Sequence, residues 1–464
     1  MSGQISSTGT IAGGISLDSA SRITASTPTP TAIAITGSTF SGGIANSGTI
    51  SAAADGISIA TVSSFSGNIS NGGRINAKTA IDIVDSTIGG SIIDTGTILA
   101  SSHGILIDSA SRINGGTTGI FIRAQTFTGG ISNAGTIGAY QFGILGLELS
   151  TFSGGISNSG RISRGLSGIW FDYANTISGG INNSGIISGG GAGITLQFIN
   201  TFMGGISNSG TISGGAWGIV FVGVTTFSGG ISNGGKIVVA TSAGISVDGL
   251  NFSGGISNSG TISGGDVGIF VNGVERTFSG GISNSGTISG AYIGILVNGV
   301  ESSFSGGISN SGMISEGYSG ISVSGISNFS GGISNSGTIS AGGGGIYVGT
   351  VTTFSGNISN SGTITARTGI DIVGSTITGA IADTGTILAT SYGILIDSAS
   401  KIKATGTAIS ITGPTFTGGI SNAGTISAAA NYGIYVAGCG DADRRRRQRQ
   451  HHLCGLDLRQ RRLR

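Results

Sequence analysis

Carboxylates are the side chains of this sequence whose type and spacing could support catalysis. Cleavage of a polysaccharide needs clustered carboxylates, often with a basic residue, on one face of the protein. The two candidate groups are Asp82, Asp85 and Asp94, and Asp371, Asp383 and Asp397. The second group partly repeats the first in a related stretch of sequence. We therefore expect these aspartates to occupy structural positions, at a solvated surface or a corner, and not an active site.

Histidine and cysteine add little to this chemistry. His103 is the only histidine before residue 439, and Tyr392 takes its place in the related stretch, which does not fit a catalytic base. The remaining histidines and cysteines are His451, His452, Cys439 and Cys454. Their spacing matches no standard zinc site, and the glycine-rich steps lack both the lysine of a phosphate loop and the aspartates of a calcium-binding repeat. We expect no enzyme, no catalytic or metal-binding residue and no cofactor.

The sequence that surrounds these residues is a repeat. Its unit is Thr-Phe-Ser-Gly-Gly-Ile-Ser-Asn-Ser-Gly-Thr-Ile-Ser, a few variable residues and Gly-Ile-x-Val. The anchor of the unit recurs every 25 or 26 residues at Phe127, Phe152, Ile177, Phe202, Phe227, Phe252, Phe278, Phe304, Phe329 and Phe354. Such self-similarity indicates a solenoid, in which each unit buries its apolar face against its neighbours.

The apolar positions within one unit predict strands. Ile219 and Phe221 are two residues apart and so share one face of a strand, whereas the single Ile of Thr-Ile-Ser leaves Thr and Ser on the other face. Gly-Gly and Asn-Ser-Gly between the strands are typical of tight corners. We predict an all-β fold, a right-handed parallel β-helix (β-solenoid) with coils of about 25 residues and three short strands per coil, the handedness being the usual one for parallel crossovers.

Two polar rows should run along this solenoid. We expect the repeated asparagine to form a ladder of stacked amides, with members at Asn158, Asn208, Asn258, Asn284, Asn310 and Asn335. The Thr-Ile-Ser strands should project two rows of hydroxyls, as at Thr211 and Ser213, Thr261 and Ser263, and Thr287 and Ser289. Such rows could form an ice-binding face, although Thr and Ser also suit any exposed strand.

Composition and charge divide the chain at residue 438. Hydrophobic residues make up 38% and charged residues 9% of the sequence, which excludes disorder, and no apolar stretch is long enough for a membrane-spanning helix.

We assign residues 1–438 to the solenoid. It begins in the middle of a module, since Gln4 to Thr39 match Ala380 to Thr415. A longer repeat of 62 residues relates the stretch from Phe65 to Phe127 to that from Phe354 to Phe416.

Residues 439–464 break the pattern with nine arginines and three aspartates. Reading plausible codons one base further on restores the repeat, so we interpret this basic tail as the product of a frameshift and expect it to be disordered. A run such as Arg444 to Arg447 would otherwise suggest a nucleic-acid contact. Under the frameshift hypothesis, we expect no specific nucleic-acid partner.

The unit Phe-Ser-Gly-Gly-Ile-Ser-Asn-Ser-Gly-Thr-Ile-Ser with Gly-Ile-x-Val resembles repeats in the passenger regions of proteobacterial autotransporters and related haemagglutinin-like adhesins. The resemblance covers nearly all of residues 1–438. It implies a β-helical stalk at the bacterial cell surface or outside the cell, with structural or adhesive roles. Its partners would be surface components of a host or neighbouring cell, or further copies of the chain. The signal peptide and outer-membrane barrel of that family are not recognisable in this sequence. A carbohydrate-active enzyme on a β-helix is the alternative, besides the ice-binding face.

Overall fold

The computed structural model describes residues 4–28, 30–163 and 165–437. The predictions for the tail at 439–464 lie outside this part of the chain. The described residues form an all-β parallel β-solenoid with coils about 25 residues apart and about 17 turns, which confirms the predicted fold class. They contain no helix, and so none that is long and apolar enough to cross a membrane.

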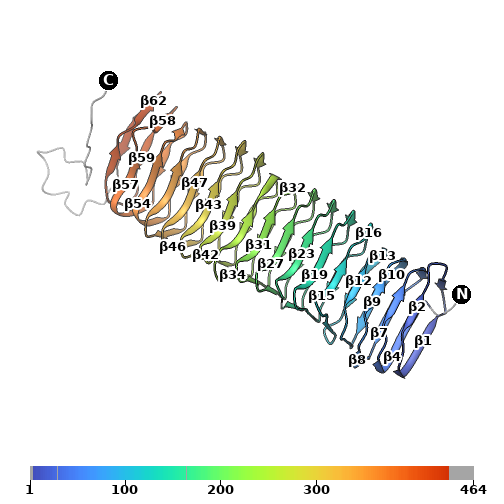
Figure 1. Cartoon of the computed structure of the whole chain (residues 1–464). Coiled ribbons are helices and arrows are strands. Elements are labelled where there is room, and N and C mark those ends of the chain that lie inside the picture. The colour runs from blue at the N-terminus through green and yellow to red at the C-terminus, as the bar shows by residue number, and fades with distance from the viewer. Residues whose placement is uncertain (1–3, 29, 164, 438–464) are drawn as a thin grey trace, which may run out of the picture. The chain divides into compact units, whose positions relative to one another are not determined.

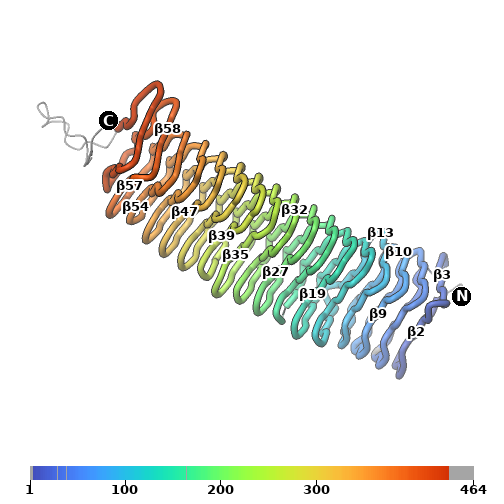
Figure 2. The backbone as a smooth tube through the Cα atoms, turned by 45° about the horizontal axis from the view of Figure 1, so that its top comes forward, coloured from blue at the N-terminus to red at the C-terminus, as the bar shows by residue number. Residues whose placement is uncertain are grey.

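The chain forms two compact units, Met1–Gly229 with Gly234–Val239, and Gly230–Asn233 with Ala240–Arg464. Within each unit, the strands of one coil pair in parallel with those of the next, and Figure 1 shows strands of successive coils running in the same direction. Figure 2 traces the same winding through successive coils. Representative neighbours are β19 (Phe142–Leu147), β23 (Ser167–Asp172) and β27 (Ala192–Gln197) in the first unit, and β39 (Val267–Asn272), β43 (Ile293–Asn298) and β47 (Ser319–Ser324) in the second.

A regular coil contains four strands where we predicted three. One such coil consists of β20 (Thr151–Phe152), β21 (Ile156–Asn158), β22 (Arg161–Ser163) and β23. The Thr-Phe step, predicted only as an anchor, is itself a short strand that pairs with Thr-Ile in the next coil. The predicted number holds in the coil formed by β8 (Ser64–Phe65), β9 (Ile69–Asn71) and β10 (Arg74–Val84), where the last two segments run together.

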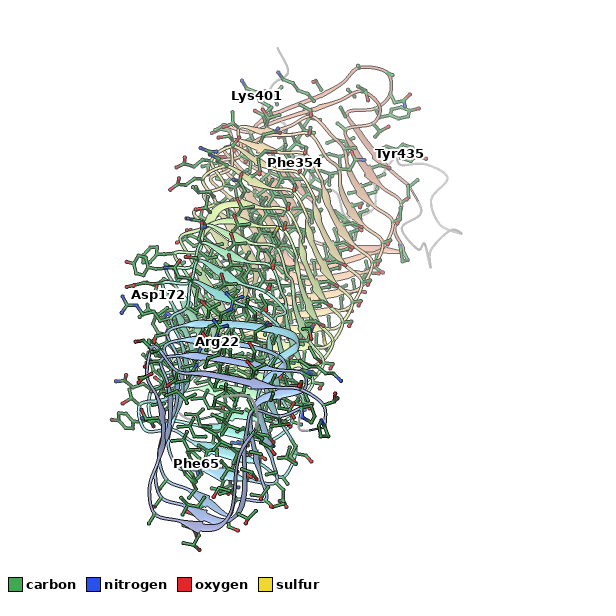
Figure 3. All side chains as sticks on the ribbon, turned by 90° about the vertical axis from the view of Figure 1, so that its right-hand side faces the viewer. Arg22, Phe65, Asp172, Phe354, Lys401 and Tyr435 are labelled. Atoms are coloured by element: carbon green, nitrogen blue, oxygen red, sulfur yellow. The ribbon has the colours of Figure 1, made fainter. Side chains whose placement is uncertain are left out.

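Each strand sends its apolar residues into the coil. In the coil from β20 to β23 the inward side chains are fully buried, and they are Phe152, Ile156, Ile162, Ile169 and Phe171. Phenylalanines stack from coil to coil: Phe127 on Phe152 with ring centroids 5.1 Å apart, and Phe278 on Phe304 at 4.7 Å. Burial of each such side chain stabilises the fold by about 1.5–3 kcal/mol. Figure 3 labels Phe65 within the coils and Asp172 at their outer edge.

The Gly-Gly corners stack as closely as the strands do. Gly130 and Gly155 both have positive φ, at 69° and 72°, a conformation that L side chains rarely adopt. A β-carbon at Gly130 would lie 2.4 Å from the carbonyl oxygen of Gly155 in the next coil. Only glycine allows the two corners to approach this closely, which explains why the corner repeats so regularly.

The two 62-residue stretches shift the repeat by half a turn. Phe65 pairs with Ile88, and Ile88 with Ile113, after which the same row continues at Ile137, an Ile of the Thr-Ile-Ser type. The row of Thr-Ile-Ser residues meanwhile becomes the phenylalanine row, because Ile98 pairs with Phe127. The second unit repeats this exchange, since Phe354 pairs with Ile377, and Ile387 with Phe416. A stretch of 62 residues therefore equals two and a half coils of about 25 residues.

The shift is possible because a coil has two similar halves. Each half contains a short strand with one inward apolar residue and a second strand that carries an inward Ile, as Ile156 on β21 and Ile169 on β23. The Ile-Ser-Asn strand can thus stack on Gly-Ile-x-Ile, as Ile131 does on Ile105. The exchange preserves the core while it moves each type of corner and outer strand to the opposite side of the coil.

Candidate functional site

The predicted asparagine ladder is confirmed within each unit. In the first unit, the Asn133 Nδ2 donates to Asn158 Oδ1 at 2.7 Å, and Asn158 Nδ2 to Asn183 Oδ1 at the same distance. In the second unit, Asn258, Asn284, Asn310, Asn335 and Asn360 are linked in the same way. Most of these amides also donate to the carbonyl of the glycine two residues later, as Asn158 does to Gly160. The hydrogen bonds within the row therefore satisfy a continuous line of buried polar groups that water does not reach.

Two of the candidate aspartates each end an asparagine row, Asp94 a short row of Asn46 and Asn71 and Asp383 the row of the second unit. Asp94 accepts from Asn71 at 2.6 Å, and Asp383 accepts from Asn360 at 2.7 Å. Both aspartates are fully buried, so the prediction of a solvated surface or corner was wrong for them. The half-turn shift explains the change of residue: the next residue in the row of Asp94 is Ile122, which offers no side-chain acceptor for a further amide. Burial raises the pKa of Asp94 to about 6.

Asp82 and Asp371 hold equivalent outward positions on the outer strands β10 and β54 (Thr363–Val373). Burial raises the pKa of both carboxyls, and the charges of Asp55 and Asp108 raise that of Asp82 further. Asp85 lies at a corner, as predicted, and its N–H donates to Asp108 at 3.0 Å. Asp397 makes the corresponding bonds to the N–H of Gly374. The six candidate aspartates therefore lie in three kinds of position: in the interior, on outer strands and at corners.

His103 lies on the outer side of β13 (Thr97–Ile107), in the coil after Asp82. Its Nδ1 is 3.0 Å from the hydroxyl of Ser102. Thr79 lies between His103 and Asp55 in the row of residues that pair from coil to coil. Among the described residues, no three His, Cys, Asp or Glu side chains come together in a way that could hold a metal ion.

The hydroxyl rows form in part. In the second unit one row is continuous and consists of Ser263, Ser289, Ser315, Ser340 and Thr365. Its partner row is interrupted at Met313. In the first unit Thr211 lies between Ile186 and Lys236, and Ser213 lies between Ser188 and Val238, so both rows are interrupted there. The predicted positions themselves are half-buried, and the ice-binding alternative stays a prediction.

An aromatic outer face in the first unit was not predicted from the sequence. It covers β19, β23, β27 and β31 (Trp217–Val222). One row across these strands, extended by β15 (Thr118–Ile122), consists of Phe121, Leu145, Trp170, Thr195 and Val220. A second row contains Phe142 and Trp217, and Trp217 is exposed. Phe142 packs edge-on against Trp170 with ring centroids 5.2 Å apart.

Two further rings border this face where the outer strands end. Tyr173 and Phe198 follow β23 and β27 directly, and their ring centroids are 5.0 Å apart with an interplanar angle of 33°. Tyr173 is 58% and Phe198 41% exposed. Both residues have positive φ, at 52° and 47°, whereas Gly223 occupies the equivalent corner in the next coil. The corner after the outer strand has this conformation in other coils as well, with Thr61, Asp85, Glu148 and Thr350 at the equivalent position.

Polar groups accompany the rings. Asp172 and Gln197 are neighbours in one outward row, one residue before Tyr173 and Phe198. The Oδ1 atom of Asp172 is buried without a hydrogen-bond partner, and burial raises the pKa of this carboxyl. In the adjoining coil Arg123 Nε donates to Glu148 Oε2 at 2.9 Å. We call Trp170, Asp172, Tyr173, Gln197 and Phe198 the aromatic strip.

The second unit has a smaller apolar outer face. Val267 and Ile293 pack with Ala243, and Phe270 and Leu296 cover them partly. At the corner beside this cluster, Tyr292 and Tyr318 stack with centroids 4.8 Å apart.

Glu316, at the end of β46 (Met313–Glu316), is an isolated buried acid. Only 8% of it is exposed, and neither carboxyl oxygen makes a well-formed hydrogen bond within the described residues. Its oxygens occupy space left by two glycines, since β-carbons at Gly290 and Gly294 would lie 3.0 and 3.1 Å from them. Burial raises the pKa of Glu316 to about 8, and the backbone N–H of Gly290 offsets this only in part.

The signal for the outer face was present in the repeat. The aromatic and aliphatic residues occupy the x of Gly-Ile-x-Val, which lies between two inward residues and must therefore point outward.

No family model, curated protein or solved structure matches this chain.

Proposed function

We propose that this chain is a non-catalytic, structural or adhesive β-solenoid from a secreted or cell-surface bacterial protein, of the kind found in autotransporter passenger regions and haemagglutinin-like adhesins. The observation that carries the proposal is the division of each coil. Inward residues and corners repeat from coil to coil, whereas the outward x position varies freely among Phe121, Leu145, Trp170 and Thr195. A repeated core with a variable outer surface suits a protein that extends and presents contacts.

The distribution of acids supports a non-catalytic role. Asp94 and Asp383 are committed to the ladders, where each accepts a hydrogen bond from a buried amide. Asp82 has two acidic neighbours, Asp55 and Asp108. A polysaccharide hydrolase would need a second carboxyl at a defined separation from it, with room for substrate between the two.

The test is an assay of the full chain against acidic and neutral polysaccharides, with reducing ends and unsaturated products measured. We expect no cleavage above that of the Asp82→Asn and Asp371→Asn variants, which remove the two outward carboxyls. Cleavage by the parent chain that is lost in either variant would overturn the proposal in favour of a carbohydrate-active enzyme.

The adhesive role needs its own measurement. Beads coated with the folded chain should attach to bacterial or host-cell surfaces more than beads coated with the heat-denatured chain. Equal attachment of both kinds of bead would contradict the adhesive role and would leave only the structural role.

A further inference from the structure

We propose that the corner after β46 is a proton-dependent latch. While Glu316 is protonated, its side chain stays inside the coil and holds the corner closed; loss of the proton releases Glu316, with Gly317 and Tyr318, toward solvent. The inference goes beyond the proposed structural or adhesive role and does not depend on it.

Glu316 occupies an inward position that small residues hold in the neighbouring coils. It pairs with Gly290 in the preceding coil and with Ala341 in the next one. Its carboxyl group lies in space that the preceding coil leaves open, because β-carbons at Gly290 and Gly294 would lie 3.0 and 3.1 Å from its oxygens. An ionisable group thus stands where a methyl group is enough in the next coil.

The strands around Glu316 offer an ionised carboxylate no partner. Both carboxyl oxygens are buried, and neither makes a well-formed hydrogen bond within the described residues. The strands that contact β46 most are β42 (Thr287–Gly290), β43, β47 and β50 (Thr338–Ala341), and none of these four carries a charged side chain.

The corners beside Glu316, formed by residues 264–266, 290–292, 316–318 and 341–343, contain no cation either. Their other titratable side chains are Asp266, Tyr292 and Tyr318, which follow one another from coil to coil. Arg367 is on β54, two coils further along the chain. A buried carboxylate without a cation or well-placed donors is far less stable than the neutral acid, so ionisation drives Glu316 toward water.

The backbone at this corner is held less firmly than at the corner before it. In the preceding coil, the N–H of Ala291 donates to the carbonyl of Gly265 at 2.9 Å. The equivalent N–H, that of Gly317, makes no such bond within the described residues, and the carbonyl of Glu316 accepts from Gly342 at 3.3 Å, which is long for a hydrogen bond. Movement of this corner therefore breaks fewer good hydrogen bonds.

An exposed pair of rings is attached to the latch. Tyr318 follows Gly317 directly, and its N–H donates to the carbonyl of Tyr292 at 3.0 Å. The rings of Tyr292 and Tyr318 stack with centroids 4.8 Å apart, and about half of each residue is exposed. Release of the corner separates the two rings, so the protonation of a buried acid changes the outer surface of the coil.

The direction of the pH dependence follows from the two environments of Glu316. Burial raises the pKa of Glu316 from 4.5 to about 8 in the closed corner, whereas the released side chain is solvated and regains the ordinary pKa. The closed corner therefore binds the proton more tightly than the open one. The ratio of open to closed corners then rises about tenfold per pH unit between these two pKa values and levels off above the higher one.

Hydrogen exchange of the full chain, read by mass spectrometry, tests the latch because it measures local opening. Exchange is followed at about pH 5.5 and about pH 7.5, and each rate is divided by the intrinsic rate at that pH. For peptides that cover residues 314–319, we expect the open-to-closed ratio to rise roughly fiftyfold between the two conditions. The corner at residues 341–343, which follows Ala341 in place of Glu316, is the internal control and should keep its protection.

Two results of this experiment would overturn the proposal. Equal protection of residues 314–319 in both conditions would show that the corner does not respond to the proton of Glu316. An equal rise in exchange at residues 341–343 would show that the coils open together and that no local latch exists.

Three variants assign the effect to Glu316. Glu316→Gln stays neutral at every pH, and Glu316→Ala copies the residue that the next coil has at this position. Both should abolish the pH dependence of exchange at the corner. Tyr292→Ala with Tyr318→Ala removes the stacked rings but leaves the acid, so it should retain the roughly fiftyfold rise. A rise that persists in Glu316→Gln or Glu316→Ala, or that disappears with the tyrosines, would refute the latch.

Discussion

Asn158 shows what one buried amide contributes when it is part of a row. Its Oδ1 accepts from Asn133 and its Nδ2 donates to Asn183, each at 2.7 Å. The interior offers these neighbours no water, so the loss of one member leaves a donor on one side and an acceptor on the other without a partner. The row therefore also fixes the register of the coils, because any sliding would break every bond in it.

We predict that Asn158→Ala lowers the free energy of unfolding by about 2–4 kcal/mol, since two buried groups lose their partners. The measurement is urea unfolding followed by circular dichroism. The matched control is Asn200→Ala, which removes an exposed amide that donates to Asn175 at 3.0 Å and should change the stability by less than about 0.5 kcal/mol. A similar small change for both variants would show that the ladder does not stabilise the fold.

Glu316 should make stability depend on pH. Its folded pKa is raised from 4.5 to about 8, so the folded state binds this proton more tightly than the unfolded chain does. The contribution of Glu316 is then fully favourable below about pH 4.5, falls by about 1.4 kcal/mol per pH unit as the pH rises toward 8, and changes little above that.

We expect Glu316→Gln to flatten this dependence, because glutamine stays neutral at every pH. Urea unfolding of the parent and variant at about pH 5 and about pH 7.5 gives the difference that belongs to Glu316 alone. Glu301→Gln, a change at an exposed glutamate of the same unit, serves as the control. Parallel pH profiles for the parent and Glu316→Gln would contradict the prediction.

At the level of strands, the period and the apolar positions of the sequence were enough to predict the fold class. Ile212, expected inside, is fully buried on β30 (Thr211–Gly214). The number of strands was underestimated because the Thr-Phe step was treated only as the anchor of the repeat. Pairing with the coils on both sides makes it a strand, as at Phe202, and no local pattern of the sequence contains that information.

The half-turn shift was invisible in the sequence for a different reason. An alignment of the repeats matches identical residues, such as Phe with Phe. Stacking of coils requires only that an apolar residue of one coil lies on an apolar residue of the next. Ile98 therefore meets Phe127 without any penalty to the core. The same shift explains why Asp94 is buried. An aspartate in the sequence suggests a surface position, but Asp94 lies at the end of an asparagine row and accepts a hydrogen bond there. The aromatic strip was missed because the x position was treated as free.

Ile212→Asp tests the inward face of one strand. A carboxylate at this fully buried position has no partner, and the strand cannot slip by one residue without turning its neighbours outward. We expect a loss of several kcal/mol in unfolding free energy, measured by thermal or urea unfolding. Ser213→Asp places the same group on the outward face of the same strand and should have a much smaller effect. If both variants melted at the parent temperature, the inward and outward faces would be wrongly assigned.

At the level of the whole molecule, stability in a solenoid is a sum over coils and the contacts between neighbouring coils. Length can then change by whole coils without loss of the fold, provided that the junction joins positions that would stack anyway. The 62-residue stretch between Phe65 and Phe127 offers a sharper test, because it contains two and a half coils and reverses the two halves of the coil.

We predict that deletion of residues 66–127 gives a folded protein. Thr128 would follow Phe65, so Ile131 would stack on Ile44 and Asn133 on Asn46, at the spacing of a regular coil. The half-turn shift disappears, and the ladder that now ends at Asp94 would continue from Asn46 to Asn133 without a buried acid. We therefore expect a cooperative transition in circular dichroism, with a melting temperature at about pH 8 no lower than that of the parent.

The control removes the same number of residues from regular coils. Deletion of residues 129–190 joins Thr128 to Gly191, a corner that belongs to the other half of the coil, and it takes Asn133, Asn158 and Asn183 out of their row. Because this junction creates a half-turn mismatch without the matching corners and without an aspartate to end the row, it should lower the melting temperature or cause aggregation. If instead this chain folds as well as the parent while the chain without residues 66–127 aggregates, two and a half coils is the wrong description of the longer repeat, and the pairing of Ile98 with Phe127 does not reflect an exchange of halves.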